Sequence, residues 1–242
     1  MGNSAFERIK QVPRDSIVVL AAIVSYIPFM FLTLFFVFNE RALMASSQFG
    51  VLQFELAWTP KMIDKIFTAW GSANIQYEIY AHHVDYLYLF VYGLFALLCI
   101  LLLARRLEGR LQQVGFFFVL APVLAAIFDA MENVFLLSML TRGAPGGWSD
   151  PVLASLCATF KIAFLGASIA FALIAGVRLL ARRYAAREIY FYLTIVVAGM
   201  IMVGALLFWE PYLCYVIGPV YYAIVILFIW VSRRGSMVAS SL

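Results

Sequence analysis

The sequence predicts an all-α protein, a polytopic membrane helix bundle that forms one domain over residues 1–242. Hydrophobic residues make up 65% of the chain and charged residues 12%, whereas a typical soluble domain is roughly half apolar and about a quarter charged. So few charges could not cover the surface of a water-soluble chain of this length. Six long apolar stretches, with Lys and Arg alternating between their two sides, support the same conclusion.

The spans follow from length and hydropathy, because a helix needs about 20 mainly apolar residues to cross the hydrocarbon core. The first stretch follows a basic head, FERIKQVPRD. Its apolar core is about twice the usual length of a signal-peptide core, so we expect an uncleaved anchor. Six stretches qualify, at roughly 16–38, 84–104, 115–139, 152–177, 189–208 and 212–232.

The positive charges predict the orientation of these spans. Of the 17 Lys and Arg residues, twelve lie beside the spans on one side, four lie on the other side, and Lys161 lies inside a span. Cytoplasmic loops of membrane proteins carry the excess of Lys and Arg. We therefore expect both termini on the cytoplasmic side. The positive balance then reflects membrane topology, and we expect no nucleic-acid partner.

The longest connection, residues 39–83, is expected on the outer side and contains a short amphipathic helix over residues 59–71. Thr59 and Pro60 form an N-cap followed by proline at the first helical position, and Gly71 is a stop signal. This helix either lies along the outer interface or packs as a lid over the mouth of the bundle. Its apolar face comprises Met62, Ile63, Ile66, Phe67 and Trp70.

Polar residues inside the third and fourth spans are the main functional signal, because charges within a bilayer persist only where they find partners or water. The third span carries Asp129, Glu132 and Asn133 at spacings that share one helical face. The fourth span carries Lys161, which lies at the same depth as Asp129, roughly 15 Å from the outer end of its span. We expect Lys161 to pair with Asp129. A second acid then remains, which must be protonated, hydrated or paired elsewhere.

A second polar group lies at the outer start of the second span. His82, Asp85, Tyr88 and Tyr92 fall at helical spacing. They belong either to an exposed surface or to a polar path that leads inward, with Asp85 above Asp129 and Glu132. Neighbouring His82 and His83 point in different directions on a helix. A zinc site of His82, Asp85 and Glu132 is chemically conceivable, but we expect no metal.

Three features together resemble a group of uncharacterised bacterial integral membrane proteins. They are the run from Asp129 to Asn133 (acid-x-x-Glu-Asn), Lys161 in the next span, and the outer segment Phe54-Glu55-Leu56-Ala57-Trp58-Thr59-Pro60 that leads into the amphipathic helix. The resemblance covers about half of the chain, residues 54–161. It implies a bacterial inner membrane and brings no known activity.

Three functions remain open. The favoured hypothesis is a protein that binds or translocates a lipophilic or anionic small molecule, with membrane lipids as partners and carboxylates that handle protons. The alternative is an intramembrane enzyme that acts on a lipid or isoprenoid, with Asp129 or Glu132 as general acid or base and Lys161 stabilising negative charge. The third is a structural or assembly protein in which the ion pair locks the fold. No phosphate-binding loop, GxSxG, HExxH or CxxCH motif is present, so we expect no cofactor.

Overall fold

The computed structural model describes residues 15–145 and 147–181, and every regular element in this part of the chain is a helix. The helices are α2 (Asp15–Ser46), α3 (Val51–Glu55), α4 (Pro60–Arg106), α5 (Gly109–Phe118), α6 (Ala121–Arg142) and α7 (Ser149–Ala181). Four helical segments are long and apolar enough to cross a membrane: Ile17–Ser46, Pro60–Arg106, Gly109–Arg142 and Ser149–Leu179. The predicted spans 189–208 and 212–232 lie outside the described residues.

The helices extend well beyond the ends of the predicted spans, so the predicted connection 39–83 is wrong in extent. Helix α2 continues to Ser46 and α4 begins at Pro60, which leaves only residues 47–59 between them. Glu40, Glu78 and His82 are buried in these added turns. In a hydropathy pattern, polar residues such as these predict the end of a span. In the structure they face the interior of the bundle, so the helices continue past them.

The amphipathic helix is present and forms the first turns of α4. The Thr59 side chain accepts a hydrogen bond from the Met62 amide at 3.3 Å, and Pro60 follows as the first helical residue. Gly71 ends this segment with φ 67° and ψ 174°, and a second helical stretch continues directly to Arg106. Glycine suits this turn because a side chain disfavours positive φ. We call residues 60–70 the cap helix and residues 72–106 the shaft of α4.

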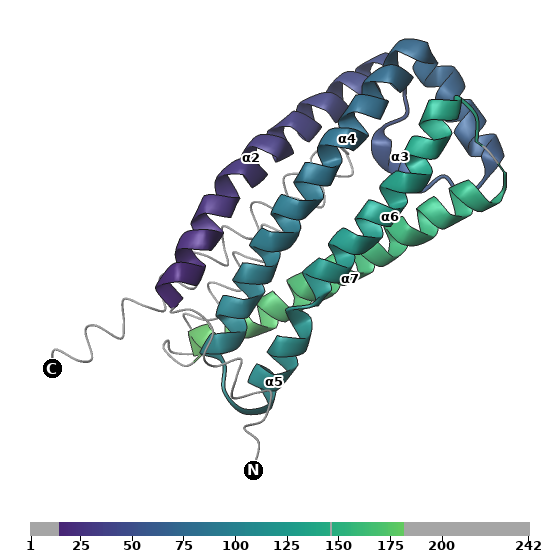
Figure 1. Ribbon diagram of the computed structural model, residues 1–242. Coiled ribbons are helices and arrows are strands. Elements are labelled where there is room, and N and C mark those ends of the chain that lie inside the picture. The colour runs from purple at the N-terminus through teal and green to yellow at the C-terminus, as the bar shows by residue number, and fades with distance from the viewer. Residues whose placement is uncertain (1–14, 146, 182–242) are drawn as a thin grey trace, which may run out of the picture.

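The cap helix covers one end of the bundle. Ile63 and Ile66 are fully buried and pack with Leu136, Met139 and other apolar residues of α6. Lys61, Asp64, Lys65 and Thr68 are exposed on the opposite face. Figure 1 shows the cap helix and α3 together at one end of the molecule, with α5 at the other end.

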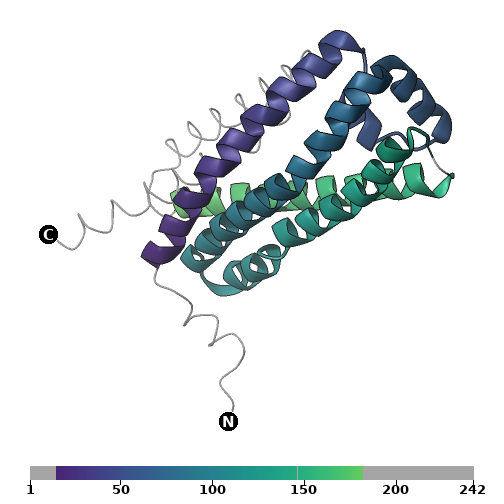
Figure 2. The same ribbon diagram turned by 45° about the horizontal axis from the view of Figure 1, so that its top comes forward.

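The long helices form two neighbouring pairs, with the shaft of α4 connecting them. Helix α2 packs along α4, α6 packs along α7, and α4 also contacts α6 (Figures 1 and 2). The predicted third span is interrupted between α5 and α6 at residues 119–120. Phe118 of α5 stacks on Phe171 of α7 with ring centroids 5.0 Å apart, which fixes α5 against the bundle.

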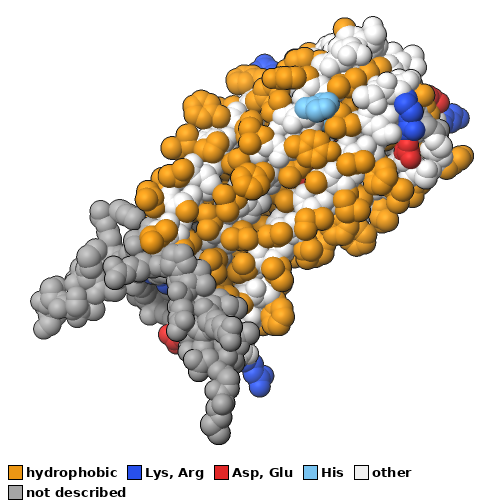
Figure 3. All heavy atoms as spheres, in the orientation of Figure 1, with side chains coloured by type: hydrophobic (Ala, Val, Ile, Leu, Met, Phe, Trp, Pro, Cys, Tyr) orange, Lys and Arg blue, Asp and Glu red, His pale blue; other side chains and the backbone are white. Residues whose placement is uncertain are grey.

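The outer flanks of the helices are apolar. Phe31, Phe38, Phe90 and Phe117 each expose more than 60% of their surface. Figure 3 shows apolar side chains along the length of one face, with most of its charged side chains near the two ends. An apolar band between charged ends is the distribution that a lipid bilayer requires of a spanning bundle.

Candidate functional site

The predicted ion pair between Lys161 and Asp129 is present, and it is part of a larger cluster. Lys161 Nζ lies 3.2 Å from Asp129 Oδ1, 2.7 Å from Glu132 Oε2 and 3.1 Å from Glu55 Oε2. The lysine side chain is only 12% exposed, and that of Glu132 is fully buried. One buried ammonium therefore contacts three carboxyl groups, and we refer to these four residues as the lysine cluster.

Glu55 is the member of the lysine cluster that the sequence pattern did not reveal. It ends the five-residue helix α3, which is held from three sides. Ser155 Oγ donates to the Glu55 carbonyl at 3.0 Å, and the buried Glu40 carboxylate accepts the Val51 amide at 2.8 Å. A Cβ on Gly50 would lie only 1.9 Å from Glu40 Oε1, so glycine is required where this carboxylate approaches the backbone.

The lysine cluster contains more acid than its single lysine can neutralise. The carboxyl groups of Glu55, Asp129 and Glu132 each lie within 3.2 Å of one ammonium, and a single positive charge balances only one negative charge. Glu132 Oε2 contacts Lys161 outside hydrogen-bond geometry, and Oε1 has no hydrogen-bond partner in the described part of the chain. Burial raises the pKa of Glu55, as does the charge of Asp129, while the Lys161 ammonium opposes this shift. The cluster is thus a place where a proton can be held.

The second polar group faces the interior, so its interpretation as an exposed surface is wrong: all four residues, His82, Asp85, Tyr88 and Tyr92, line one cavity. The Tyr92 hydroxyl donates to Asp129 Oδ2 at 2.8 Å, and Asn133 Nδ2 donates to Asp85 Oδ2 at 2.6 Å. These bonds connect the shaft of α4 to α6. Within the described residues no cation forms an ion pair with Asp85, which lies beside the lysine cluster and accepts a hydrogen bond from Asn133.

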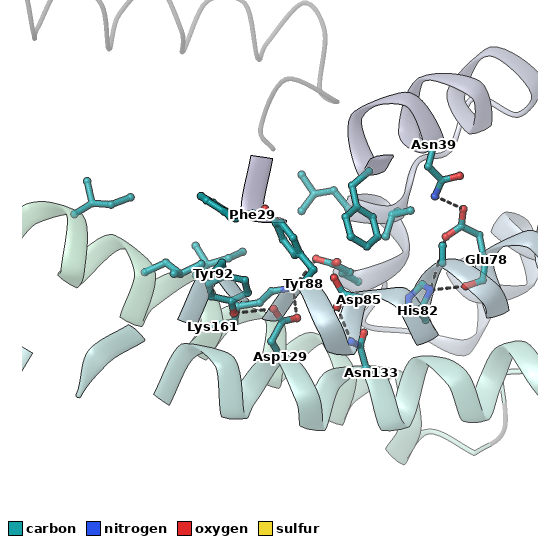
Figure 4. A pocket seen from close by; sticks show the side chains of 18 residues that line it. Phe29, Asn39, Glu78, His82, Asp85, Tyr88, Tyr92, Asp129, Asn133 and Lys161 are labelled. Carbon is teal, nitrogen blue, oxygen red and sulfur yellow. Dashed lines mark hydrogen bonds and ion pairs between the residues drawn. The ribbon is translucent and has the colours of Figure 1, made fainter. Parts of the chain in front are cut away.

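A cavity of about 390 Å³ brings these residues together. Glu55, Asp85, Asp129, Asn133 and Lys161 line it, and the fully buried Glu132 lies behind them. Figure 4 shows the side chains of Tyr92, Lys161 and Asp129 at one end of this cavity. Its volume falls within the range of small-molecule sites, roughly 300–1,000 Å³. Apolar and aromatic walls complete it, including Phe29, Phe36, Tyr88, Leu165 and Ile169.

The far end of the cavity holds a second set of polar residues, of which the sequence pattern revealed only His82. Asn39 Nδ2 donates to Glu78 Oε1 at 3.0 Å, and His82 Nδ1 lies 2.8 Å from the Glu78 carbonyl oxygen (Figure 4). Glu78 lies four residues before His82 and seven before Asp85, so helical spacing extended back beyond residue 84 would have revealed it. Both Glu78 and His82 are buried.

The conceivable zinc site is not formed. His82, Asp85 and Glu132 do not converge, and within residues 15–145 and 147–181 no group of three His, Cys, Asp or Glu side chains is arranged to hold a metal ion. His83, adjacent to His82, is exposed. The polar chemistry of the cavity therefore rests on carboxyl, amide, hydroxyl, imidazole and ammonium groups.

Comparison with known proteins adds no relative: no protein-family model, curated protein or solved structure matches this chain. In the part of the chain that the structure describes, the fold and the site define a helical bundle with four candidate membrane-spanning helices and a buried, acid-rich cavity. The function therefore has to be inferred from the chemistry of that cavity.

Proposed function

We propose that this protein binds a lipophilic molecule with a positively charged group in its cavity, and that binding is coupled to proton release from the buried acids. A multi-pass protein of the bacterial inner membrane, with six spans and both termini in the cytoplasm, would present this cavity in the outer half of the bilayer. The observation that carries the proposal is the excess of carboxyl groups over cations in the lining of the cavity.

The charge balance favours a cationic ligand over an anionic one. Lys161 already contacts Glu55, Asp129 and Glu132, so an anion would have to displace a carboxylate from a buried ion pair. Asp85 also lines the cavity. It accepts a hydrogen bond from the side-chain amide of Asn133 and forms no ion pair within the described residues. A ligand ammonium beside Asp85 would gain a charge-assisted hydrogen bond in a partly desolvated place.

The walls suit the lipophilic part of such a ligand. Phe29 and Tyr88 stack with ring centroids 5.6 Å apart, and Phe36 packs against the same tyrosine at 5.1 Å. All three rings line the cavity. Aromatic faces attract cations as well as apolar groups, so this wall accepts both parts of a lipophilic amine.

Binding explains the cavity better than the two alternatives do. A purely structural ion-pair lock would leave the acids paired in a closed interior, yet Asp85 lines an open space and Glu78 Oε2 has no hydrogen-bond partner among the described residues. The enzyme alternative assigns acid–base chemistry to Asp129 or Glu132, whereas Asp129 is occupied by Lys161 and Tyr92 and the fully buried Glu132 is not part of the cavity lining.

The test compares octylamine with octanol, which has the same chain but no charge, by titration calorimetry on protein in lipid nanodiscs with empty nanodiscs as reference. Octylamine should bind more tightly than octanol and release a proton, which buffers of different ionisation enthalpy report. Asp85→Asn should weaken octylamine binding about 10-fold or more, given the worth of a hydrogen bond to a charged group. Asp64→Asn, the same change on the exposed face of the cap helix, should have no effect. Equal binding of octylamine and octanol, or equal behaviour of the two variants, would refute the proposal.

A further inference from the structure

The end of the cavity away from Lys161 contains a buried acid whose bonding capacity is unused. Glu78 is 0% exposed and lines the cavity. Its Oε1 accepts a hydrogen bond from Asn39, whereas its Oε2 has no hydrogen-bond partner among the described residues. A buried carboxylate oxygen without a donor is costly, so this atom marks a place where a ligand donor would be stabilised.

His82 adds a second acceptor to the same place. Its Nδ1 atom lies 2.8 Å from the Glu78 carbonyl oxygen, which can only accept, so Nδ1 carries the proton in that bond. The neutral ring then presents Nε2 without a proton. The ring is buried and held edge-on against Phe54, with centroids 6.1 Å apart. Glu78 Oε2 and His82 Nε2 are therefore two acceptor atoms on side chains one helical turn apart, and both side chains line the cavity.

Carboxyl groups outnumber cations at this end of the cavity. Within the described residues no Lys or Arg pairs with Glu78, and the neutral His82 ring lies 3.7 Å from Glu78 Oε2 through Nδ1. Glu40 and Glu55 lie close enough to act on it electrostatically, and the Glu40 oxygens are already bonded to the Val51 amide. A cationic donor fits this end better than a hydroxyl group.

The two ends of the cavity have a fixed spacing. Glu78 and Asp85 lie seven residues apart on the uninterrupted shaft of α4, which places them on one face about 10 Å apart along the helix axis. Apolar side chains also line this cavity, among them Phe36, Leu52 and Ala81. Figure 4 shows Phe29 and Tyr88 beyond Asp85, on the side away from Glu78. An extended carbon chain of roughly eight or nine bonds spans the distance between Glu78 and Asp85.

We propose that Glu78 and His82 form a second head-group site, and that the ligand is an elongated molecule with a cationic donor at each end, of the long-chain diamine class. This inference rests on the proposed function, because Asp85 holds the first ammonium. Glu78 Oε2 and His82 Nε2 hold the second, Asn39 orients the Glu78 carboxylate, and apolar side chains of the cavity lining contact the carbon chain.

The test uses diaminooctane, with an amine at each end, and octylamine, with one, on the full chain in nanodiscs. In the wild type, diaminooctane should bind about 10-fold to 100-fold more tightly, as expected for one added hydrogen bond between charged groups. Glu78→Gln keeps the size of the side chain and the Asn39 bond but should bring the ratio of the two affinities close to one. His82→Phe, which keeps a ring against Phe54, should lower the same ratio. Asp64→Asn should retain the wild-type ratio.

The outcomes separate this inference from the proposed function. A wild-type ratio near one, or a ratio that Glu78→Gln leaves intact, would overturn the second head-group site even if octylamine binding depends on Asp85. Octylamine binding that is indifferent to Asp85→Asn would refute the proposed function, whatever the ratio. Because the readout is a ratio measured on one protein sample, a loss of folded protein does not imitate the expected result.

Discussion

Replacing Lys161 by methionine tests the electrostatic basis of the site. Lys161 Nζ lies about 3 Å from each of three carboxyl groups, at 2.7, 3.1 and 3.2 Å. At an effective dielectric constant of about 20, one such contact is worth roughly 5 kcal/mol before desolvation. Desolvation offsets much of this, and removing one partner of a buried pair costs about 3–5 kcal/mol because the other charge is left uncompensated. We therefore expect Lys161→Met to lower the unfolding temperature by on the order of 10 °C.

The assay is thermal unfolding in detergent, with Lys65→Met as the control. Lys65 is exposed on the cap helix, and its loss should change stability by less than about 0.5 kcal/mol. The double variant Lys161→Met/Glu132→Gln should be more stable than Lys161→Met alone, because one buried negative charge is removed with its partner. If Lys161→Met unfolds at the same temperature as Lys65→Met, the three ion pairs are not present in the protein and the electrostatic basis of the site is refuted.

Three further changes test other parts of the structure. Tyr92→Phe should cost about 1–2 kcal/mol in thermal unfolding, because its hydroxyl donates to Asp129 from a buried position. Gly50→Ala should cost at least about 1 kcal/mol, because the new Cβ would lie 1.9 Å from Glu40 Oε1 and displace the carboxylate that holds α3. Glu55→Gln should flatten the dependence of stability on pH. Since burial raises the folded pKa of Glu55 above its ordinary value, its contribution is complete below about pH 4.5 and is lost as pH rises through the folded pKa.

Each of these three predictions has a control or an outcome that would contradict it. Gly166→Ala meets no atom within 4 Å and lies within helix α7, so it should be neutral or slightly stabilising. Equal effects of the two glycine substitutions would show that α3 does not need the close approach of Glu40. A Tyr92→Phe protein as stable as the wild type would show that the hydroxyl does not bond Asp129. A steeper pH dependence in Glu55→Gln would mean that folding does not raise the pKa of Glu55.

The pairing of Lys161 with Asp129 could be predicted because it depends only on depth. Both residues lie inside apolar spans that are joined by a short loop, so counting along each helix placed them at one level. Glu55 could not be found in this way, because it lies on a five-residue helix in a connecting segment. Its contact with Lys161 depends on how that segment folds back into the bundle, and tertiary packing of this kind has no local periodicity.

The extent of the helices was harder to predict than their existence. Hydropathy alone would end the first span near residue 38 and begin the second at residue 84, because the residues between them include Glu40, Glu78 and His82. In the structure these residues are buried, since each finds a partner within the bundle. Two of these side chains, Glu78 and His82, also form the far end of the cavity.

The turn at Gly71 divides α4 into two parts with separate roles. Glu78, Asp85 and Tyr92 recur every seven residues along the shaft, so one residue inserted between two of them would rotate those before the insertion by about 100° relative to those after it. The cap helix lies beyond the turn and sets none of these angles. Exchanging residues 60–70 for another amphipathic sequence would change how this end of the bundle is covered without rotating Glu78 or Asp85 on the shaft, so this segment can vary while the shaft keeps its polar face.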